Sequence, residues 1–133
     1  MMYVCEEDTI VRSIPVSTGR PTSRTLTRAW KGQVGDDWGH RWLNESLQAD
    51  HIWFLFKDLY GNILIHSVPY TQQGDAKTYD QLDALGVRPS SRGCIRISPQ
   101  DAAWLKRWNP IGVDILITGW PGPVRQVAEN EGK

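Results

Sequence analysis

The sequence predicts a mainly β domain with one clear helix, and two stretches carry this prediction. HIWFLFKD at 51–58 is dense in aromatic and β-branched residues, and the turn LYGN leads from it to a second apolar run, ILIHS at 63–67, as in a β-hairpin. SPQDAAWLKRWN at 98–109 has helix-start signals instead: Ser98 as N-cap, a Pro at the first helical position and an Asp three residues after the cap. Expected strands outnumber helices, so the class is mainly β.

The first third of the chain is expected to supply short strands and a loop. Residues 2–5 and 9–16 are predicted as two strands around the acidic turn EED, and Pro15 indicates an edge position or a strand end. STGRPTSRT at 17–25 is rich in turn formers and predicts a loop. Residues 25–44 are ambiguous, and we expect a strand followed by an irregular loop.

The last half is predicted to hold a long polar connection and two more strands. Residues 68–90 are mostly polar, and a connection of this length is usually functional or contains a short helical turn, for which TYDQLDAL at 78–85 is suited. GCIRI at 93–97 and VDILITG at 113–119 are expected strands.

Composition limits the function classes. A chain of 133 residues fits one domain, 1–133, with a short tail from about residue 120. Lys plus Arg equals Asp plus Glu at 15 each, which argues against a general surface for nucleic acid or anionic membrane. No apolar run approaches the roughly 20 residues of a membrane span. The start, MMYVCEEDTI, lacks a signal-peptide pattern, so either the protein is cytosolic or an export segment lies outside this sequence.

Two cysteines are too few for a disulfide framework. Cys5 is expected to be a buried strand residue. Ligand types for a metal occur at Cys5, His40, His51, His66 and Cys94, but no pair has the short spacing of a structural zinc site. The spacing therefore predicts no metal site.

Cys94, within SSRGCIRIS at 90–98, is the first candidate for chemistry. Taken alone it is either a strand residue or a nucleophile. A reactive cysteine needs a nearby cation or base, and Arg92 and Arg96 carry positive charge beside it. Gly93 permits a turn that can direct successive backbone N–H groups at one point, as in an oxyanion hole. His66, at the end of the strand ILIHS, is a second candidate, although alone it could equally be a hydrogen-bonded core residue.

Taken together, these segments resemble the L,D-transpeptidase catalytic domain, also called the YkuD domain. The matching pieces are ILIHS and SSRGCIRIS, in the order of the family's histidine and cysteine motifs. IVRSIPVSTG, PQDAAWLKRW and PIGVDILITG resemble an early strand and turn, the helix after the cysteine and a closing strand. The resemblance covers roughly residues 3–119 and implies a YkuD-type mixed β-sandwich or barrel.

The resemblance implies roles for individual residues. Cys94 would be the nucleophile and His66 its general base, with the main-chain carbonyl of Ser67 orienting the imidazole. Backbone N–H groups around Gly93 would hold the oxyanion. The residues implied in substrate binding are Arg92, Arg96, Ser91 and Tyr70, and bracing of the loop is a second role for Arg96.

The implied activity is transfer of peptidoglycan stem peptides through a Cys94 thioester, which gives 3→3 crosslinks in the cell envelope. The resemblance implies that this reaction needs neither a metal nor an organic cofactor. A hydrolase on the same fold, such as an L,D-carboxypeptidase, is one alternative. A non-catalytic peptidoglycan-binding module is another, and retention of both Cys94 and His66 speaks against it.

The sequence departs from the family pattern in two places. Arg92 stands where relatives usually carry a histidine before the Gly-Cys pair, and arginine cannot act as a base at neutral pH. The family's extra strand before the first segment is also missing here. An exposed sheet edge would remain, and a homodimer through that edge is a further expectation.

Overall fold

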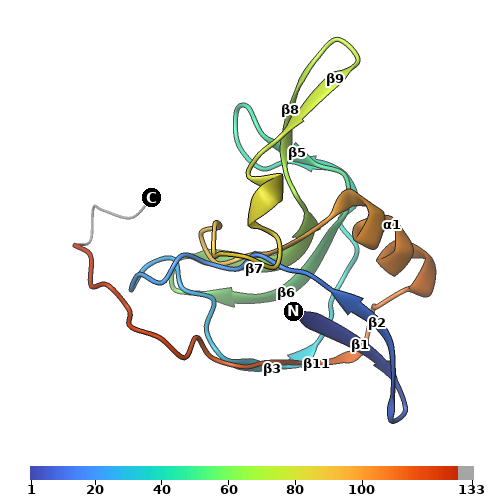
Figure 1. Ribbon diagram of the computed structural model, residues 1–133, viewed down its shortest axis with the longest axis vertical. Coiled ribbons are helices and arrows are strands. Elements are labelled where there is room, and N and C mark those ends of the chain that lie inside the picture. The colour runs from blue at the N-terminus through green and yellow to red at the C-terminus, as the bar shows by residue number, and fades with distance from the viewer. Residues whose placement is uncertain (129–133) are drawn as a thin grey trace.

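A three-stranded sheet at the centre of the molecule positions the candidate residues (Figure 1). In the computed structural model, which describes residues 1–128, its strand order is β10 (Ile95–Ile97), β7 (Gly61–Ser67) and β6 (Ile52–Asp58). β6 and β7 pair antiparallel, which confirms the predicted hairpin, and β10 pairs parallel with β7.

Smaller sheets and one α-helix surround the central sheet. One two-stranded sheet pairs β1 (Met2–Glu6) with β2 (Thr9–Ile14). A second pairs β3 (Trp30–Gln33) with β11 (Asp114–Ile117). A four-stranded sheet has the order β4 (Arg41–Trp42), β5 (Gln48–Ala49), β8 (Tyr70–Gln73) and β9 (Ala76–Tyr79). Together with helix α1 (Pro99–Trp108), these elements confirm the predicted mainly β class.

The helix begins as the sequence predicts. Ser98 is the N-cap, and its hydroxyl accepts a hydrogen bond from the Asp101 backbone N–H at 3.0 Å. Asp101 is buried and pairs with Arg12 of β2 at 2.7 Å, which fastens the helix to the N-terminal hairpin. The helix ends at Trp108, and its C-cap residue Asn109 has a φ of 67°, which leaves the helical conformation before Pro110.

The polar connection 68–90 is more regular than predicted. It contains the hairpin of β8 and β9, which projects from the rest of the chain in Figure 1, and a 3₁₀ helix at Leu82–Ala84 inside the expected helical turn. The hairpin escaped prediction because the residues from Thr71 to Thr78 are exposed on both faces of the ribbon. They therefore show no alternation of apolar and polar residues.

Both faces of the central sheet are covered. Ile63 and Ile65 of β7 belong to the main hydrophobic core, which also includes residues of the helix and of β1, β2 and β10. Leu64 lies on the opposite face, in a smaller cluster with Ile52 and Ala49, and Cys94 packs against that cluster. Because side chains alternate between faces, His66 follows Leu64 on this second face.

Cys5 corrects one expectation, because its side chain is exposed instead of buried. In β1 only Val4 is fully buried, and a register irregularity separates Val4 from Cys5. A strand with one side against the core buries alternate residues, and Cys5 lies on the outer side.

The outer edge of β1 has no strand partner among residues 1–128, since β1 pairs with β2 alone. Homodimerisation through this edge stays a prediction. No helix in the described part of the chain is long and apolar enough to cross a membrane.

The expected tail has two parts. Residues 120–128 run past the loop at 21–23, where the Arg125 N–H donates to the carbonyl of Pro21 at 2.9 Å. The remainder of the tail, residues 129–133, lies outside the described residues.

Candidate active site

The parallel pairing of β7 with β10 brings the candidate histidine and cysteine segments together. Arg96 lies directly opposite His66, and Ile95 lies opposite Ile65. Cys94 comes just before β10, two residues from Arg96, so its side chain emerges on the face that carries His66. Two segments 28 residues apart in sequence thereby place a thiol, an imidazole and a guanidinium on one face of one sheet.

The His66 imidazole is buried and fixed. His66 is 3% exposed, and its Nδ1 lies 2.7 Å from the main-chain carbonyl oxygen of Ser67. A carbonyl only accepts hydrogen bonds, so Nδ1 carries the proton and Nε2 has the free lone pair. Burial lowers the pKa of His66 to about 4, and the nearby charge of Arg96 acts in the same direction. The resting imidazole is therefore neutral.

Ser67 is itself held from the neighbouring segment. Its hydroxyl accepts from the backbone N–H groups of Asp50 at 3.2 Å and His51 at 3.3 Å, and its own N–H donates to the His51 carbonyl at 3.0 Å. These bonds fix the peptide whose carbonyl contacts His66. The imidazole orientation is thus set by backbone geometry and needs no carboxylate.

The Cys94 thiol is mostly covered and is protonated at rest. Burial raises the pKa of Cys94, while the Leu64 backbone N–H and the charge of Arg96 lower that pKa and the charge of Asp58 raises it. Arg96 thus favours the thiolate, but the loss of hydration outweighs its positive charge and the net direction is upward. Sγ lies 3.6 Å from the carbonyl oxygen of Asn62.

The turn before Cys94 is tightly built around Gly93. Gly93 has a φ of 134°, and a Cβ there would lie 2.9 Å from Cδ1 of Ile63. The Ser91 hydroxyl accepts from the Gly93 N–H at 3.1 Å and donates to the Cys94 carbonyl at 2.6 Å. The hydroxyl of Thr27 donates to the Gly93 carbonyl at 2.7 Å.

The residues expected to bind substrate fall into different environments. Ser91 is buried and engaged in the turn, and Arg92 is exposed. The Arg96 side chain is 12% exposed and pairs with Asp80 at 3.1 Å. Tyr70 is buried, its hydroxyl donates to Asp50 at 2.5 Å, and burial together with Asp50 raises the pKa of Tyr70 to about 12.

Sequence reasoning did not identify Thr27 or Asp80. Both lie in polar stretches whose composition predicts only loops, and each meets the site through a contact distant in sequence, 66 residues from Gly93 and 16 from Arg96 respectively. A single sequence carries no signal for such contacts. No three side chains of His, Cys, Asp or Glu within residues 1–128 lie close enough together to hold a metal ion.

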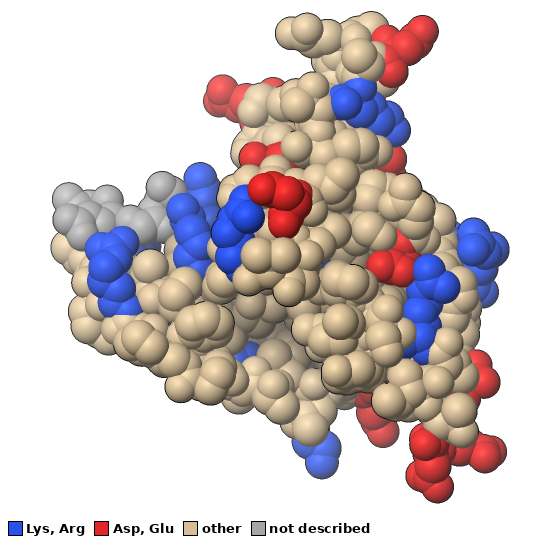
Figure 2. Space-filling model, viewed as in Figure 1, with Lys and Arg blue, Asp and Glu red and all other residues tan. Residues whose placement is uncertain are grey.

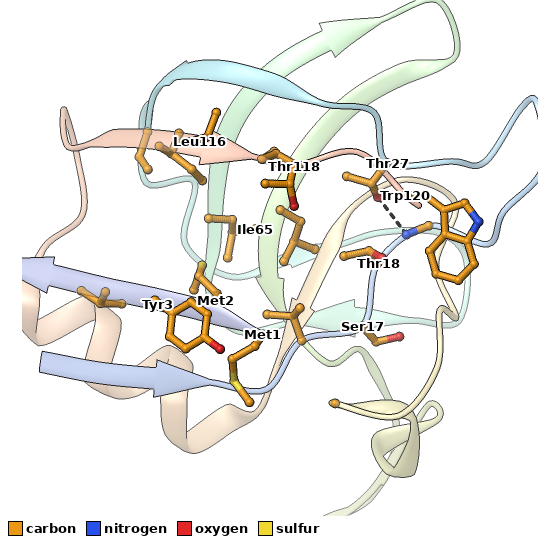
Figure 3. A pocket seen from close by; sticks show the side chains of 18 of the residues that line it. Met1, Met2, Tyr3, Ser17, Thr18, Thr27, Ile65, Leu116, Thr118 and Trp120 are labelled. Carbon is orange, nitrogen blue, oxygen red and sulfur yellow. Dashed lines mark hydrogen bonds between the residues drawn. The ribbon is translucent and has the colours of Figure 1, made fainter. Parts of the chain in front are cut away.

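A cavity of about 730 Å³ lies on the opposite face of the sheet from the thiol and the imidazole. Ile65 and Ile95 line it, as do residues of β1 and β11, whereas His66 and Cys94 do not. Figure 3 shows Met1, Tyr3 and Leu116 around it, with the Thr27 hydroxyl bonded to the Gly19 N–H at 2.8 Å. The candidate catalytic side chains, in contrast, lie on the side of the sheet that carries the thiol.

The surface in Figure 2 is mostly uncharged, with acidic side chains at the end of the projecting hairpin and at the turn between β1 and β2. Basic side chains on this face are interspersed with neutral ones and form no continuous stripe. This distribution agrees with the zero formal net charge of the whole sequence.

Comparisons with known proteins agree with this geometry. No curated protein matches the chain. An L,D-transpeptidase structure from Mycobacterium smegmatis is similar over 83% of this chain and 50% of that one, with 25% identity and a TM-score of 0.50, so this chain spans about half the length of that relative. The family model of the L,D-transpeptidase catalytic domain, YkuD, matches residues 1–118. That match covers most of the sequence and includes both candidate segments, and the chain therefore belongs to the L,D-transpeptidase catalytic domain family.

Proposed function

We propose that this protein is a cysteine-dependent L,D-transpeptidase that joins peptidoglycan stem peptides, with Cys94 as nucleophile and His66 as general base. One observation carries the proposal: a neutral imidazole, oriented by the Ser67 carbonyl at 2.7 Å, lies on the same sheet face as the thiol. A nucleophile, a base and an orienting acceptor make up the usual set for acyl transfer.

Proton transfer and attack occur together in this proposal. The resting thiol and imidazole are both neutral, since burial raises the pKa of Cys94 and lowers that of His66. The S–H proton passes to Nε2 as sulfur bonds to the carbonyl carbon that precedes the terminal D-alanine, and the carbonyl electron pair moves onto oxygen. When the tetrahedral intermediate collapses, the imidazolium gives this proton to the departing nitrogen of D-alanine, and a thioester on Cys94 remains.

An amine of a second stem then attacks the thioester. Its proton goes to His66 and from there to the departing sulfur, so that a 3→3 crosslink forms and the free thiol is restored. The oxyanion is received by backbone N–H groups of the turn 92–94. The Gly93 N–H is engaged with Ser91, which makes the N–H groups of Arg92 and Cys94 the better candidates.

Intact mass after incubation with a carbapenem tests the nucleophile. We expect one covalent adduct, none on Cys94→Ala and much slower formation on His66→Ala. Cys94→Ala keeps the exposed Cys5, so it also controls for reaction at that thiol. Folded protein without an adduct, or an adduct that persists in Cys94→Ala, would refute the assignment.

Product analysis then separates transfer from hydrolysis. With a stem tetrapeptide and an amine acceptor we expect the crosslinked product, and with the tetrapeptide alone slow release of D-alanine. Release that the acceptor neither accelerates nor diverts would assign a carboxypeptidase instead. Binding without any turnover would assign a peptidoglycan-binding module.

Arg92 is proposed to bind a carboxylate of the donor peptide. It is exposed, lies two residues before the nucleophile and forms no ion pair with residues 1–128. Loss of one hydrogen bond to a charged group costs about 1.5–3 kcal/mol, so we expect Arg92→Gln to raise KM about tenfold or more and Arg92→Lys to recover part of the loss. Alkylation of Cys94 by iodoacetamide should not change, and equal KM values in Arg92→Gln and the wild type would remove the role.

A location in the cell envelope follows from the proposed substrate. Fractionation of the producing cells tests it, and recovery of the protein only from the cytosol would contradict it.

A further inference from the structure

Arg96 joins the catalytic face to the long connection that precedes Cys94. It lies opposite His66 in the sheet register, and its backbone N–H and carbonyl are both bonded to Ser17, at 2.8 Å and 3.0 Å. Its guanidinium Nη1 lies 3.1 Å from Oδ2 of Asp80 and 3.4 Å from the hydroxyl of Ser90. The side chain is 12% exposed, so this charge has lost most of its hydration.

Asp80 is well placed to hold this charge. It follows β9 directly, and its backbone N–H donates at 2.8 Å to the carbonyl of Pro69, which fixes the end of the projecting hairpin beside the end of β7. Ser90, the second partner of the guanidinium, shares a hydrogen bond of 2.6 Å with Ser17. The middle of the connection between His66 and Cys94, at Asp80, and its last part, at Ser90, therefore both contact Arg96.

We propose that Asp80 is a positioning residue for the proposed acyl transfer, and that its ion pair with Arg96 fixes the guanidinium beside His66 and Cys94 and balances the charge there. Within the described residues 1–128, Asp80 contacts neither the thiol nor the imidazole. It acts through its ion pair with Arg96. The inference rests on the proposed function of the site.

The electrostatics explain why balance matters. The charge of Arg96 lowers the pKa of His66, which weakens the base, and it also lowers the pKa of Cys94, which favours the thiolate. The other charged group that shifts the pKa of Cys94 is Asp58, which acts in the opposite direction; Arg92, in the preceding turn, is exposed to solvent. An unbalanced guanidinium would leave a thiol that ionises more easily and a histidine that accepts its proton less readily.

Alkylation of Cys94 by iodoacetamide across pH tests the proposal in a Cys5→Ser background, where Cys94 is the one remaining thiol. Asp80→Asn leaves the guanidinium unbalanced, and we expect alkylation about three- to tenfold faster at neutral pH, with its profile displaced to lower pH. Arg96→Gln removes the cation and should displace the profile the other way. Asp80→Glu should restore the original profile.

Asp83→Asn is the matched control. Asp83 pairs with Arg88 at 3.1 Å in the same connection, but its side chain is 77% exposed. Removing this carboxylate deletes the same charge without reaching the catalytic face, so the alkylation profile should stay that of the Cys5→Ser parent.

Turnover supplies an independent readout. With stem tetrapeptide and an amine acceptor, Asp80→Asn should lower kcat while KM changes little, because Asp80 does not contact the substrate. Opposite displacements of the alkylation profile in Asp80→Asn and Arg96→Gln support the proposal. Equal displacements, no displacement, or the same effect in Asp83→Asn would overturn it. Alkylation needs no substrate, so it decides this question even if the transpeptidase assignment fails.

Discussion

At the scale of single residues, burial shifts the pKa values of the proposed catalytic pair, Cys94 and His66, more than nearby charges do. The thiol and the imidazole both lose hydration, and for both the neutral form is favoured. The sequence predicted these two residues and the orienting carbonyl by resemblance. It could not predict the direction of the thiol pKa, because the cover provided by Ile52 and Leu64 comes from other strands.

The neutral state of His66 should make stability depend on pH. The unfolded chain binds a proton on this histidine below its ordinary pKa of 6.5, whereas the folded chain does so only near pH 4. The unfolded state therefore holds more protons between these values, and the free energy of unfolding should fall by about 3 kcal/mol as pH falls from 6.5 to 4. Urea denaturation at several pH values measures this.

His66→Gln is the control for that measurement. It removes the titrating group, so the slope of stability against pH in this window should be smaller than in the wild type. Parallel slopes for the two proteins would show that the histidine is not held neutral.

Gly93 should not tolerate a side chain. Its φ of 134° is reached by other residues only with strain, and the added Cβ would lie 2.9 Å from Ile63. We expect Gly93→Ala to lose about 1–3 kcal/mol of stability and to acylate far more slowly, since the turn carries the proposed nucleophile. Gly74→Ala is a matched control, because Gly74 also has a positive φ, 60°, but nothing lies within 4 Å of its added Cβ. Equal acylation by Gly93→Ala and Gly74→Ala would contradict this account.

At the scale of elements, the best predicted parts are those whose signals are local. The N-cap at Ser98 and the hairpin at 51–67 are each indicated by residues that are neighbours in sequence, and both are confirmed. The hairpin of β8 and β9 is mostly exposed to solvent. The β8 sequence Tyr-Thr-Gln-Gln therefore lacks the alternation of apolar and polar residues that would mark a buried face. The contacts of Asp80 and Thr27 depend on how loops fold back onto the sheet, and the pattern of neighbouring residues does not encode this.

Helix α1 gives a prediction at this scale. Ser98→Ala removes the acceptor for the Asp101 N–H, and loss of an N-cap costs about 1 kcal/mol. We expect a lower Tm, with near-normal stability in Ser98→Asp, which can also cap. Carbapenem acylation at 25 °C should stay close to wild type, because the helix is distinct from the turn that carries Cys94. A Tm unchanged by Ser98→Ala would show that the cap contributes nothing.

At the scale of the whole molecule, the fold class and the order of most elements followed from the sequence, while the pairings between strands distant in sequence did not. The pairing of β3 with β11 joins Trp30 to Ile117, and that of β7 with β10 joins His66 to Arg96. In neither pair are the two strands joined by a short turn, so the local sequence gives no signal that they pair. Only the resemblance to a family placed the histidine segment beside the cysteine segment before the structure did.

The pairing of β3 with β11 also has a consequence for synthesis of the chain. Gln33 pairs with Asp114, which lies 81 residues later in the sequence. This sheet therefore cannot form until nearly all of the described chain has left the ribosome. Topologies dominated by such distant pairs fold slowly, on the order of milliseconds to seconds. During that interval Trp30, the apolar side chain of β3, lacks its partner strand. Nascent chains halted before β11 are therefore expected to be the form most readily captured by chaperones or lost to proteolysis.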